Sequence, residues 1–361
     1  MSDEVTTHAG TAATDAVSFE ELQLATRNHG MPLEALRYDV TPIGMHFLLT
    51  HYDVPDTSGW QLQVGGRVDT PAVLGLDELR AHETVTRRVT MECAGNGRAR
   101  LRPRPLSQPW LNEAIGTGGW TGTPVVALLD ALGVWDDATE VVFTGADRGL
   151  EGGVEQHYAR SLRLEEIRET GALLAWELNG MPLPPQHGAP LRLVVPGWYG
   201  MASVKWLRAI DVVGEPFDGY QQVRAYRFRQ VPEEPGEPVR RIAVRSLMVP
   251  PGIPDFYTRH RIVDRGVHEL CGRAWSGHGP IASVEVSVDG GRTWEEVELD
   301  RPDDPAAWTG WRSRWEADRP GEQELRCRAT DEVGNRQPDE PVCNLGGYAV
   351  NAVHRCPVTV R

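Results

Sequence analysis

The sequence predicts an α+β domain followed by an all-β sandwich. Between residues 20 and 235, helix and strand patterns are interleaved without the regular βαβ rhythm of a doubly wound sheet. A segment rich in proline and glutamate, 231–241, separates this region from the rest of the chain. Beyond residue 245 only short strand patterns remain. We therefore expect a disordered lead-in at 1–19, a first domain at 20–235 and a second domain at 236–361.

Local patterns in the first domain support this mixture of helix and strand. Residues 61–68, QLQVGGRV, alternate as a strand does, and 125–135 read as a short helix that ends near Gly133. Residues 140–147, EVVFTGAD, form an apolar strand pattern that runs into a turn. Residues 191–200 read as a buried strand closed by Pro-Gly. No simple repeat connects these segments, which favours α+β over a parallel sheet.

The second domain shows hairpin patterns. Residues 281–299, IASVEVSVDGGRTWEEVEL, alternate apolar and polar residues around Asp-Gly-Gly, which is a strong hairpin signal. Residues 322–335 read as another strand that enters a turn. Short strands at this spacing are typical of a β-sandwich.

Composition excludes several classes of function. The formal net charge is −14, whereas a nucleic-acid-binding protein needs a basic face. No apolar run approaches the roughly 20 residues of a membrane-spanning helix. The five cysteines include no CxxC pair, so a zinc finger is not expected. The N-terminal residues show no export signal, which favours a cytoplasmic protein and leaves a periplasmic location open.

One stretch, MECAGNGR at 91–98, carries the chemical question. Cys93 can be a small buried core residue, a nucleophile, or a soft ligand for a redox metal. Small residues around it leave room for a bulky group, and Arg98 supplies the positive charge that favours a thiolate. A cysteine-protease interpretation needs a histidine base, and no family-like signature surrounds His187. From these residues alone the alternatives stay open.

The segment CAGNGR resembles the cysteine loop of the sulfite oxidase family of molybdenum enzymes, written C-A-G-N-R-R. Further segments match that family in the same order, so that the resemblance extends over residues 20–361. They are TRNH at 26–29, FTGAD at 143–147, HGAPLRLVVPGWYGMASVKWL at 187–207, AWSGHGPIASVEVSVDGGRTW at 274–294 and NLGGYAVNAVHR at 344–355. The resemblance implies a sulfite-oxidase-type molybdopterin-binding domain followed by an immunoglobulin-like dimerisation domain, and hence a homodimer.

The resemblance also implies roles for individual residues. Cys93 would bind molybdenum directly, and Arg27 and Arg98 would hold a small oxyanion beside Trp110 and the active-site Tyr226. Donors for the pterin cofactor would be Ala25, Thr26, Arg27, Asn28, His29, Asp147, His187, Arg192, Ser203, Val204 and Lys205. The implied reaction is oxidation of sulfite to sulfate. No segment resembles a haem domain, so electrons would pass to a separate acceptor, either a cytochrome or oxygen.

Two positions depart from the family's pattern. The cysteine loop has Gly97 before Arg98, where the family has a second arginine. In the second domain, Gly346 follows Asn-Leu where sulfite oxidases carry a pocket arginine. The related nitrate reductases also lack that arginine, although they generally lack the tyrosine that is present here as Tyr226. A molybdenum reductase of nitrate or of an S- or N-oxide is therefore the alternative, and a non-catalytic cofactor carrier is a third.

Overall fold

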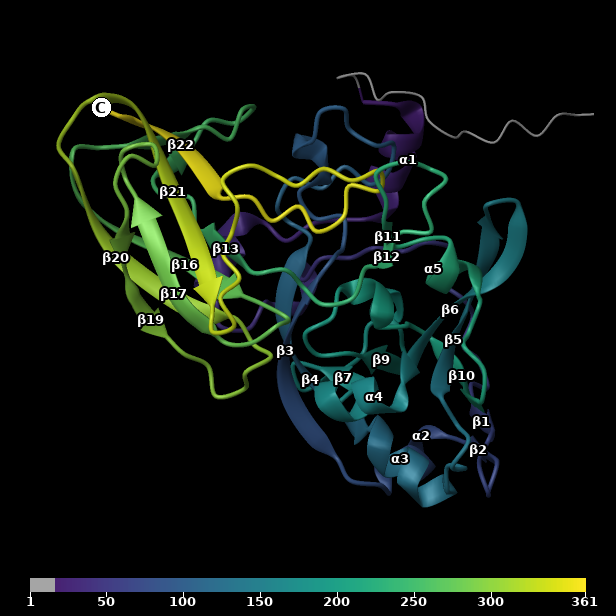
Figure 1. Cartoon of the computed structure of the whole chain (residues 1–361). Helices are drawn as coiled ribbons and strands as arrows, with labels where there is room; N and C mark the ends of the chain where they lie inside the picture. The colour runs from purple at the N-terminus through teal and green to yellow at the C-terminus, as the bar shows by residue number, and fades with distance from the viewer. Residues whose placement is uncertain (1–16) are drawn as a thin grey trace, which may run out of the picture.

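The computed structural model describes residues 17–361, which form two domains that lie side by side (Figure 1). Most of the expected lead-in at 1–19 lies outside the described residues. The last residues of this segment are not a lead-in, because Ser18 caps the first helix. The Ser18 hydroxyl accepts from the Glu21 backbone N–H, and the Glu21 carboxylate accepts from the Ser18 N–H. None of the helices within 17–361 is long and apolar enough to cross a membrane.

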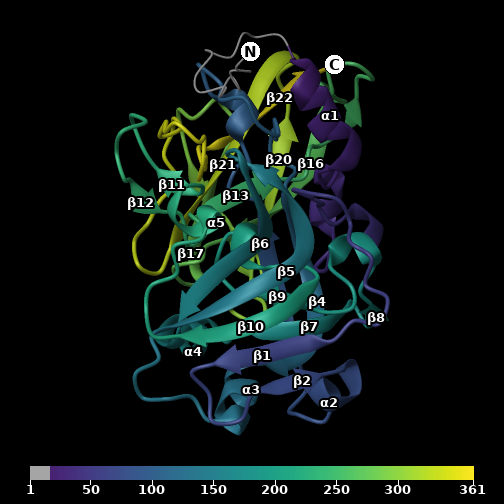
Figure 2. The same cartoon turned by 90° about the vertical axis from the view of Figure 1, so that its right-hand side faces the viewer.

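The first domain contains two five-stranded sheets (Figure 2). The first has the order β2-β1-β10-β5-β6, with β1 and β10 parallel and the other pairs antiparallel. The second has the antiparallel order β3-β4-β7-β8, with β9 also paired to β7. This arrangement confirms α+β. The strands are β1 Leu62–Gly66, β2 Ala72–Leu74, β3 Val85–Glu92, β4 Ile115–Pro124, β5 Glu140–Glu151, β6 Val154–Arg163, β7 Leu173–Leu178, β8 Met181–Pro182, β9 Arg192–Val194 and β10 Leu207–Val213.

Short helices connect and cover these strands. The helix predicted at 125–135 is α3, which follows Pro124 and ends where Gly133 takes a left-handed φ of 71°. The α-helices are α1 Phe19–Arg27, α2 Leu76–Arg80, α3 Val125–Leu132, α4 Leu164–Thr170 and α5 Tyr220–Val223. The 3₁₀ turns are Leu33–Arg37, Ile43–Met45, Arg98–Arg100, Pro185–His187 and Gly200–Ala202.

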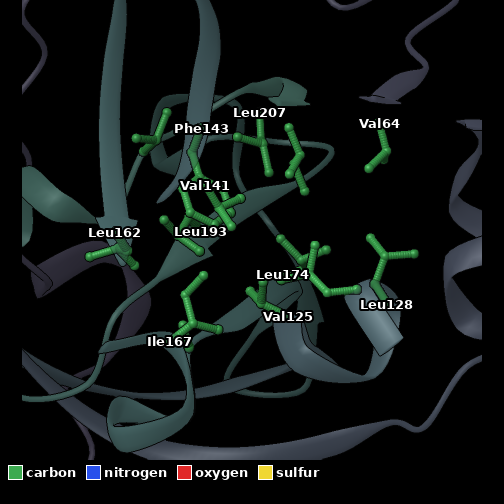
Figure 3. Packing of buried hydrophobic residues seen from close by; sticks show 14 of the residues in the cluster. Val64, Val125, Leu128, Val141, Phe143, Leu162, Ile167, Leu174, Leu193 and Leu207 are labelled. Carbon is green, nitrogen blue, oxygen red and sulfur yellow. The ribbon is translucent and has the colours of Figure 1, made fainter. Parts of the chain in front are cut away.

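The main core of the first domain lies between its sheets and the helices. Figure 3 shows α3, with Val125 and Leu128, and α4, with Ile167, packing toward Phe143 of β5 and Leu193 of β9. All five side chains are almost completely buried. Each such side chain contributes about 1.5–3 kcal/mol of transfer free energy, so this core holds the strands that carry the site in fixed register.

One strand differs from the sequence prediction. The pattern at 140–147 was expected to turn after Asp147, but β5 continues to Glu151 and pairs with β6 along this length. The register shifts between Thr144 and Arg148, which marks a β-bulge. The bulge, rather than a turn, places Asp147 at the site described below.

The second domain is a sandwich of a four-stranded sheet, β13-β16-β20-β19, and a six-stranded sheet, β14-β15-β22-β21-β17-β18. Within the described residues no α-helix follows Val223, and the predicted hairpin forms between β17 and β18. Its strands are β13 Arg245–Met248, β14 Ile253–Pro254, β15 Arg261–Val263, β16 Gly266–Trp275, β17 Ile281–Ser287, β18 Glu295–Glu296, β19 Glu298–Asp300, β20 Thr309–Ala317, β21 Gly321–Asp331 and β22 His354–Val360. The connecting segment contains the short pair β11 Arg227–Phe228 and β12 Glu237–Pro238.

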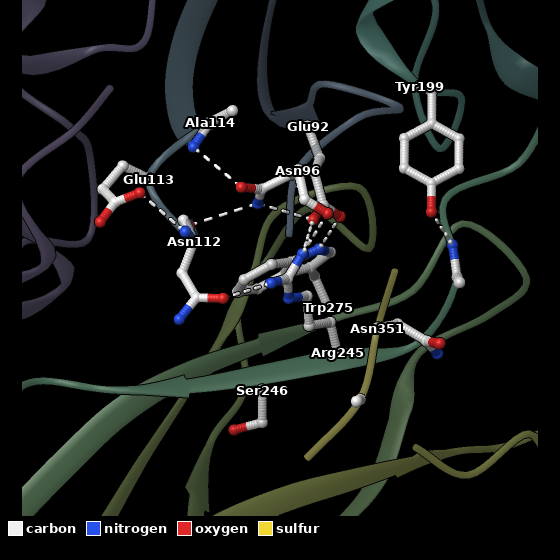
Figure 4. A network of polar contacts seen from close by, with 12 residues as sticks. Glu92, Asn96, Asn112, Glu113, Ala114, Tyr199, Arg245, Ser246, Trp275 and Asn351 are labelled. Atoms are coloured by element: carbon white, nitrogen blue, oxygen red, sulfur yellow. Dashed lines mark hydrogen bonds and ion pairs between the residues drawn. The ribbon is translucent and has the colours of Figure 1, made fainter. Parts of the chain in front are cut away.

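A buried polar network joins the two domains beside the cysteine loop (Figure 4). Glu92, the last residue of β3, accepts from Arg245 Nη1 at 2.6 Å, from Trp275 Nε1 at 2.8 Å and from Asn96 Nδ2 at 2.9 Å. Arg245 and Trp275 belong to the sandwich, and both ends of the ion pair are at most 3% exposed. Its cost of desolvation is offset by these further hydrogen bonds. The network therefore fixes the cysteine loop against the second domain.

Candidate active site

Two hollows meet at Cys93. The inner hollow lies within the first domain and includes about 670 Å³ of space, counting its open mouth. It is lined by His46, Phe47, Leu48, Leu49, His51, Met91, Cys93, Ala94, Asp147, Tyr158, His187, Arg192, Gly200, Met201, Ser203, Lys205 and Tyr226. The outer hollow is lined by Leu24, Arg27, Leu49, Thr50, His51, Tyr52, Cys93, Gly95, Arg98, Ser107, Gln108, Trp110, Leu150, Glu151, Ala225, Tyr226 and Tyr348. The sulfur-bearing residue thus lies where the two spaces join.

The cysteine loop is shaped by its glycines. Cys93 directly follows β3, and its N–H donates to the Ala114 carbonyl at 2.9 Å. A Cβ at Gly95 would lie 2.5 Å from the Arg98 guanidinium, which folds over it. Gly97 has a φ of 97°, and a Cβ there would lie 2.8 Å from the Val350 carbonyl of the second domain. Residue 97 therefore has no room for the arginine that the family's pattern would place there.

Without a bound metal, burial keeps the thiol of Cys93 protonated. The side chain is 8% exposed, and burial raises the pKa of its thiol, although the Arg98 guanidinium opposes this rise. Metal binding would displace the proton, because a thiolate is the ligand form. The Trp110 indole N–H is buried beside the Cys93 sulfur, and its interaction with that sulfur also opposes the rise.

Two buried cations of the inner hollow, Arg192 and Lys205, form no ion pair within residues 17–361. Arg192 donates to the carbonyls of His187 at 2.9 Å and Ser203 at 3.2 Å, and Lys205 Nζ donates to the Leu49 carbonyl at 2.9 Å. No described carboxylate lies within ion-pair distance of either cation, although Asp147 is near enough to interact with the charge of Lys205. Burial lowers the pKa of Arg192 to about 9 and that of Lys205 to about 7. A bound anionic group would compensate both charges.

Neutral donors complete the inner hollow. Burial lowers the pKa of His187 to about 2 and that of His46 to about 4, so both imidazoles are neutral near pH 7. His46 Nε2 is buried without a partner in the described part of the chain. Burial raises the pKa of Asp147 to about 7, while Lys205 opposes the rise. Unpaired cations and an orphaned imidazole nitrogen around a thiol fit a polar cofactor that carries a phosphate.

Of the other predicted cofactor residues, some line the inner hollow and others do not. Ser203 lines the inner hollow, and its hydroxyl accepts from the Val195 N–H at 3.1 Å. Val204 instead packs into the hydrophobic core, so its side chain is not part of the hollow's lining. Ala25 and Thr26 are exposed in the last turn of α1 rather than in a loop, and they line neither hollow.

The three neighbouring residues of the segment 27–29 lie in different surroundings. Arg27 ends α1 and lines the outer hollow. Asn28 is buried, where it donates to Gln108 Oε1 at 3.0 Å and accepts from the Thr50 N–H at 2.7 Å. His29 is exposed and pairs with Leu48 through its backbone. Of these three residues, Arg27 alone lines a hollow, whereas His29 is near enough to His46 and His187 for its charge to act on them, and Asn28 anchors the end of α1.

Arg98 links the outer hollow to the second domain. Its Nε donates to the Gly346 carbonyl at 2.9 Å, and its Nη1 donates to Ser107 Oγ at the same distance. The guanidinium carbon lies 5.3 Å from the centre of the Tyr348 ring. Trp110 packs with Cys93 in a common apolar cluster. Arg98, Trp110 and Tyr226 are thus all brought to the hollow in which an oxyanion was expected.

Tyr226 is held in an unusual backbone conformation. Its φ is 50°, which is uncommon for a non-glycine residue and is typical of functional positions. Its hydroxyl lies 2.7 Å from His51 Nε2. Burial lowers the pKa of His51 to about 4 and raises the pKa of Tyr226 well above its usual value. Near pH 7 the hydrogen bond between Tyr226 and His51 therefore joins two neutral groups.

Sequence reasoning missed several lining residues. His51, His46, Tyr158 and Tyr348 all face one of the hollows. A signal was present in the stretch HFLLTH at 46–51, which places a histidine at each end of an apolar run. The pairing of His51 with Tyr226 spans 175 residues, so local sequence could not indicate it.

Comparison with known proteins places this site in a family. The Oxidoreductase molybdopterin binding domain matches residues 51–221, and the Mo-co oxidoreductase dimerisation domain matches residues 239–361. Mitochondrial sulfite oxidases of Mus musculus and Homo sapiens are both 33% identical over 89% of this chain. The NAD(P)H nitrate reductase of Hordeum vulgare is 31% identical over 89% of this chain. The chain spans 62% of the length of those sulfite oxidases and 39% of that nitrate reductase.

A solved structure shows the same fold. The sulfane dehydrogenase SoxCD of Paracoccus pantotrophus superposes with a TM-score of 0.78 at 23% identity, covering 99% of this chain and 96% of that one. Fold and site together define a molybdopterin-binding oxidoreductase. The chain belongs to the sulfite oxidase family of these enzymes.

Proposed function

We propose that this protein oxidises sulfite to sulfate and passes the electrons to an external acceptor. The observation that carries the proposal is the position of Cys93 between a cation-lined inner hollow and an outer hollow that presents Arg27, Arg98 and Tyr226. The net reaction converts sulfite and water into sulfate, two protons and two electrons. A molybdenum–molybdopterin cofactor, when bound, would supply the oxygen transfer and the two-electron chemistry.

The residues of the inner hollow would hold that cofactor. Cys93 would bind the metal as a thiolate, which is the soft ligand such a centre uses. Arg192 and Lys205 are placed to bind the anionic part of the pterin, and His187 and Asp147 to bind its polar ring. We expect Arg192→Met to lower the molybdenum and pterin content of the purified protein by about tenfold or more. Cofactor content near that of the wild type would show that Arg192 does not hold the cofactor.

The residues of the outer hollow would hold the substrate. Sulfite is a small dianion near neutral pH, so the positive charges of Arg98 and Arg27 would favour its binding close to Cys93. Trp110 forms an apolar wall that limits access of water. Tyr226 and His51 form a hydrogen-bonded pair that would carry protons away from the reacting oxyanion.

A reductase acting on nitrate is the second candidate. Gly346 removes a cation that sulfite oxidases carry, and nitrate, with a single charge, needs less positive potential. Nitrate reductases also match this chain at 30–31% identity. The presence of Tyr226 favours sulfite oxidation over this alternative.

One pair of assays separates the two functions. The molybdenum-loaded protein is given sulfite with ferricyanide as acceptor, and separately nitrate with reduced methyl viologen as donor. We expect two ferricyanides to be reduced per sulfite consumed, with saturation at low sulfite concentration. Nitrate reduction without sulfite oxidation, with molybdenum confirmed, would transfer the function to the reductase.

The natural electron acceptor and the oligomeric state are part of the proposal. We propose that this chain carries no haem and passes its electrons to a separate cytochrome, because a net charge of −14 would attract a basic partner. Direct reaction with oxygen is the alternative. Replacing ferricyanide by cytochrome c or by dissolved oxygen distinguishes the two.

We further propose a homodimer through the second domain, since residues 239–361 match a dimerisation domain. Light scattering that gives the mass of a monomer would contradict it.

A further inference from the structure

A buried arginine on β6 has no acidic partner. Arg160 is 3% exposed, and its Nη1 donates to the Gln221 carbonyl. Its Nε is buried without any hydrogen-bond partner among the described residues. No described carboxylate forms an ion pair with it. A buried charge without a partner is costly, so its retention calls for a compensating interaction.

The groups that Arg160 faces belong to the candidate active site. Its guanidinium carbon lies 5.8 Å from the centre of the Tyr226 ring. Tyr158, which lines the inner hollow, and Tyr348, which lines the outer one, are also close enough to interact with its charge. The cation thus lies behind the tyrosine wall at which an oxyanion would bind, and its potential acts across a poorly solvated region.

The second domain does not supply this charge. A Cβ at Gly346 would lie 2.2 Å from Cε2 of Tyr348, so the tyrosine ring occupies the space that a side chain at 346 would need. That ring packs 5.4 Å from Tyr226 and 5.3 Å from the Arg98 guanidinium. With the Tyr348 ring in this place, a further positive charge at this wall comes from another element.

We propose that Arg160 is a positioning residue that determines specificity for doubly charged anions, acting from β6 through Tyr226. The inference rests on the proposed function only in assigning an oxyanion to the outer hollow. Arg160 does not touch the substrate. It orients the Tyr226 ring by a cation–π contact and adds positive potential that a dianion feels twice as strongly as a monoanion.

The test compares two variants by their binding of sulfate and of chloride to the resting, molybdenum-loaded protein, measured by calorimetry. Arg160→Met keeps the length of the side chain without its charge, whereas Arg160→Lys keeps the charge. We expect Arg160→Met to weaken sulfate binding on the order of tenfold and chloride binding about threefold. Arg160→Lys should stay within about threefold of the wild type for both anions.

A matched control removes a different buried arginine. Arg273 is 8% exposed in the second domain, where it pairs with Asp39, and it lines neither hollow. Arg273→Met should bind both anions as the wild type does, and circular dichroism establishes that each variant is folded. Equal losses in Arg160→Met and Arg160→Lys, or equal losses for sulfate and chloride, would overturn the proposal. So would a wild type that binds neither anion.

This binding test is independent of the proposed reaction. If the wild type fails to oxidise sulfite but Arg160→Met selectively weakens sulfate binding, the proposed function is wrong and the role of Arg160 stands. If sulfite is oxidised and Arg160→Met leaves sulfate binding unchanged, the proposed function stands and the role of Arg160 is wrong.

Discussion

The two hollows that meet at Cys93 are built in different ways. The inner hollow is formed within the first domain by a few segments, chiefly 46–51, 91–94 and 187–205. The outer hollow combines α1, the cysteine loop, the β5–β6 hairpin and Tyr348 of the second domain. In the inner hollow the cations are fixed by backbone carbonyls, whereas Arg27 in the outer hollow is exposed. Under the proposed function, cofactor binding would be built into one domain, while substrate selection would depend on how the domains meet.

Cys93 belongs to both hollows, so its loss should have the largest effect. Cys93→Ser replaces the sulfur by a poorer ligand, and we expect activity with ferricyanide to fall more than about a hundredfold. Molybdenum analysis and the activity assay are the measurements. Cys343→Ser, an exposed position in the second domain, is the control and should be fully active. A Cys93→Ser protein as active as the wild type would show that the sulfur is not a ligand.

Glu92→Gln tests whether the buried network stabilises the junction between the domains, where the two hollows meet. The change leaves Arg245 buried opposite a neutral amide, and we expect it to lower the free energy of unfolding by about 3–5 kcal/mol. Urea denaturation measures this loss. The control is Asp303→Asn, which removes an exposed ion pair with Arg88 between the same domains and should cost less than about 1 kcal/mol. Equal effects in the two variants would show that the buried network does not fix the junction.

Tyr226 lines both hollows, and Tyr226→Phe should lower turnover without lowering the cofactor content. Loss of the hydroxyl removes the hydrogen bond to His51, and we expect turnover of sulfite to fall about a hundredfold. Cofactor content should stay at the wild-type level, because the lost group does not hold the pterin. Tyr257→Phe changes an exposed tyrosine in the second domain and should leave turnover unchanged. If the cofactor content falls in parallel with turnover, the two hollows are not separate in function.

The smallest expected effect is on the pH dependence of stability, through His354 in the second domain. Burial lowers the pKa of His354 from 6.5 to about 3, with Arg100 and Arg245 adding to the effect. Between these values the unfolded chain binds the proton and the folded chain does not, so stability falls as the pH drops through this window. His354→Asn keeps an acceptor for the Met248 N–H, which His354 Nδ1 receives at 3.1 Å. From pH 7 to pH 5, the variant should lose about 2 kcal/mol less than the wild type in urea denaturation. Identical losses would show that His354 is not the group responsible.

Much of the fold follows from local patterns. The alternation at 281–299 and the helix signal at 125–135 depend on neighbouring residues, and both elements form as expected. The extension of β5 beyond Asp147 could not be predicted, because it depends on pairing with β6. The capped start of α1 at Ser18 was missed, since the polar residues around it resemble a disordered lead-in.

The sequence by itself determined the class of chemistry. The residue types alone left three roles open for Cys93, and the resemblance of CAGNGR and of the segment 187–207 to the sulfite oxidase family implied a soft metal ligand and an anionic cofactor. Only the tertiary structure decided how the outer hollow is assembled. It brought His51 to Tyr226, placed Arg27 but not His29 in the lining of a hollow, filled the space at Gly346 with Tyr348 and placed Arg160 behind Tyr226. The physical reason is that ligand chemistry resides in individual side chains, whereas contacts and potentials between distant segments exist only after the chain has folded.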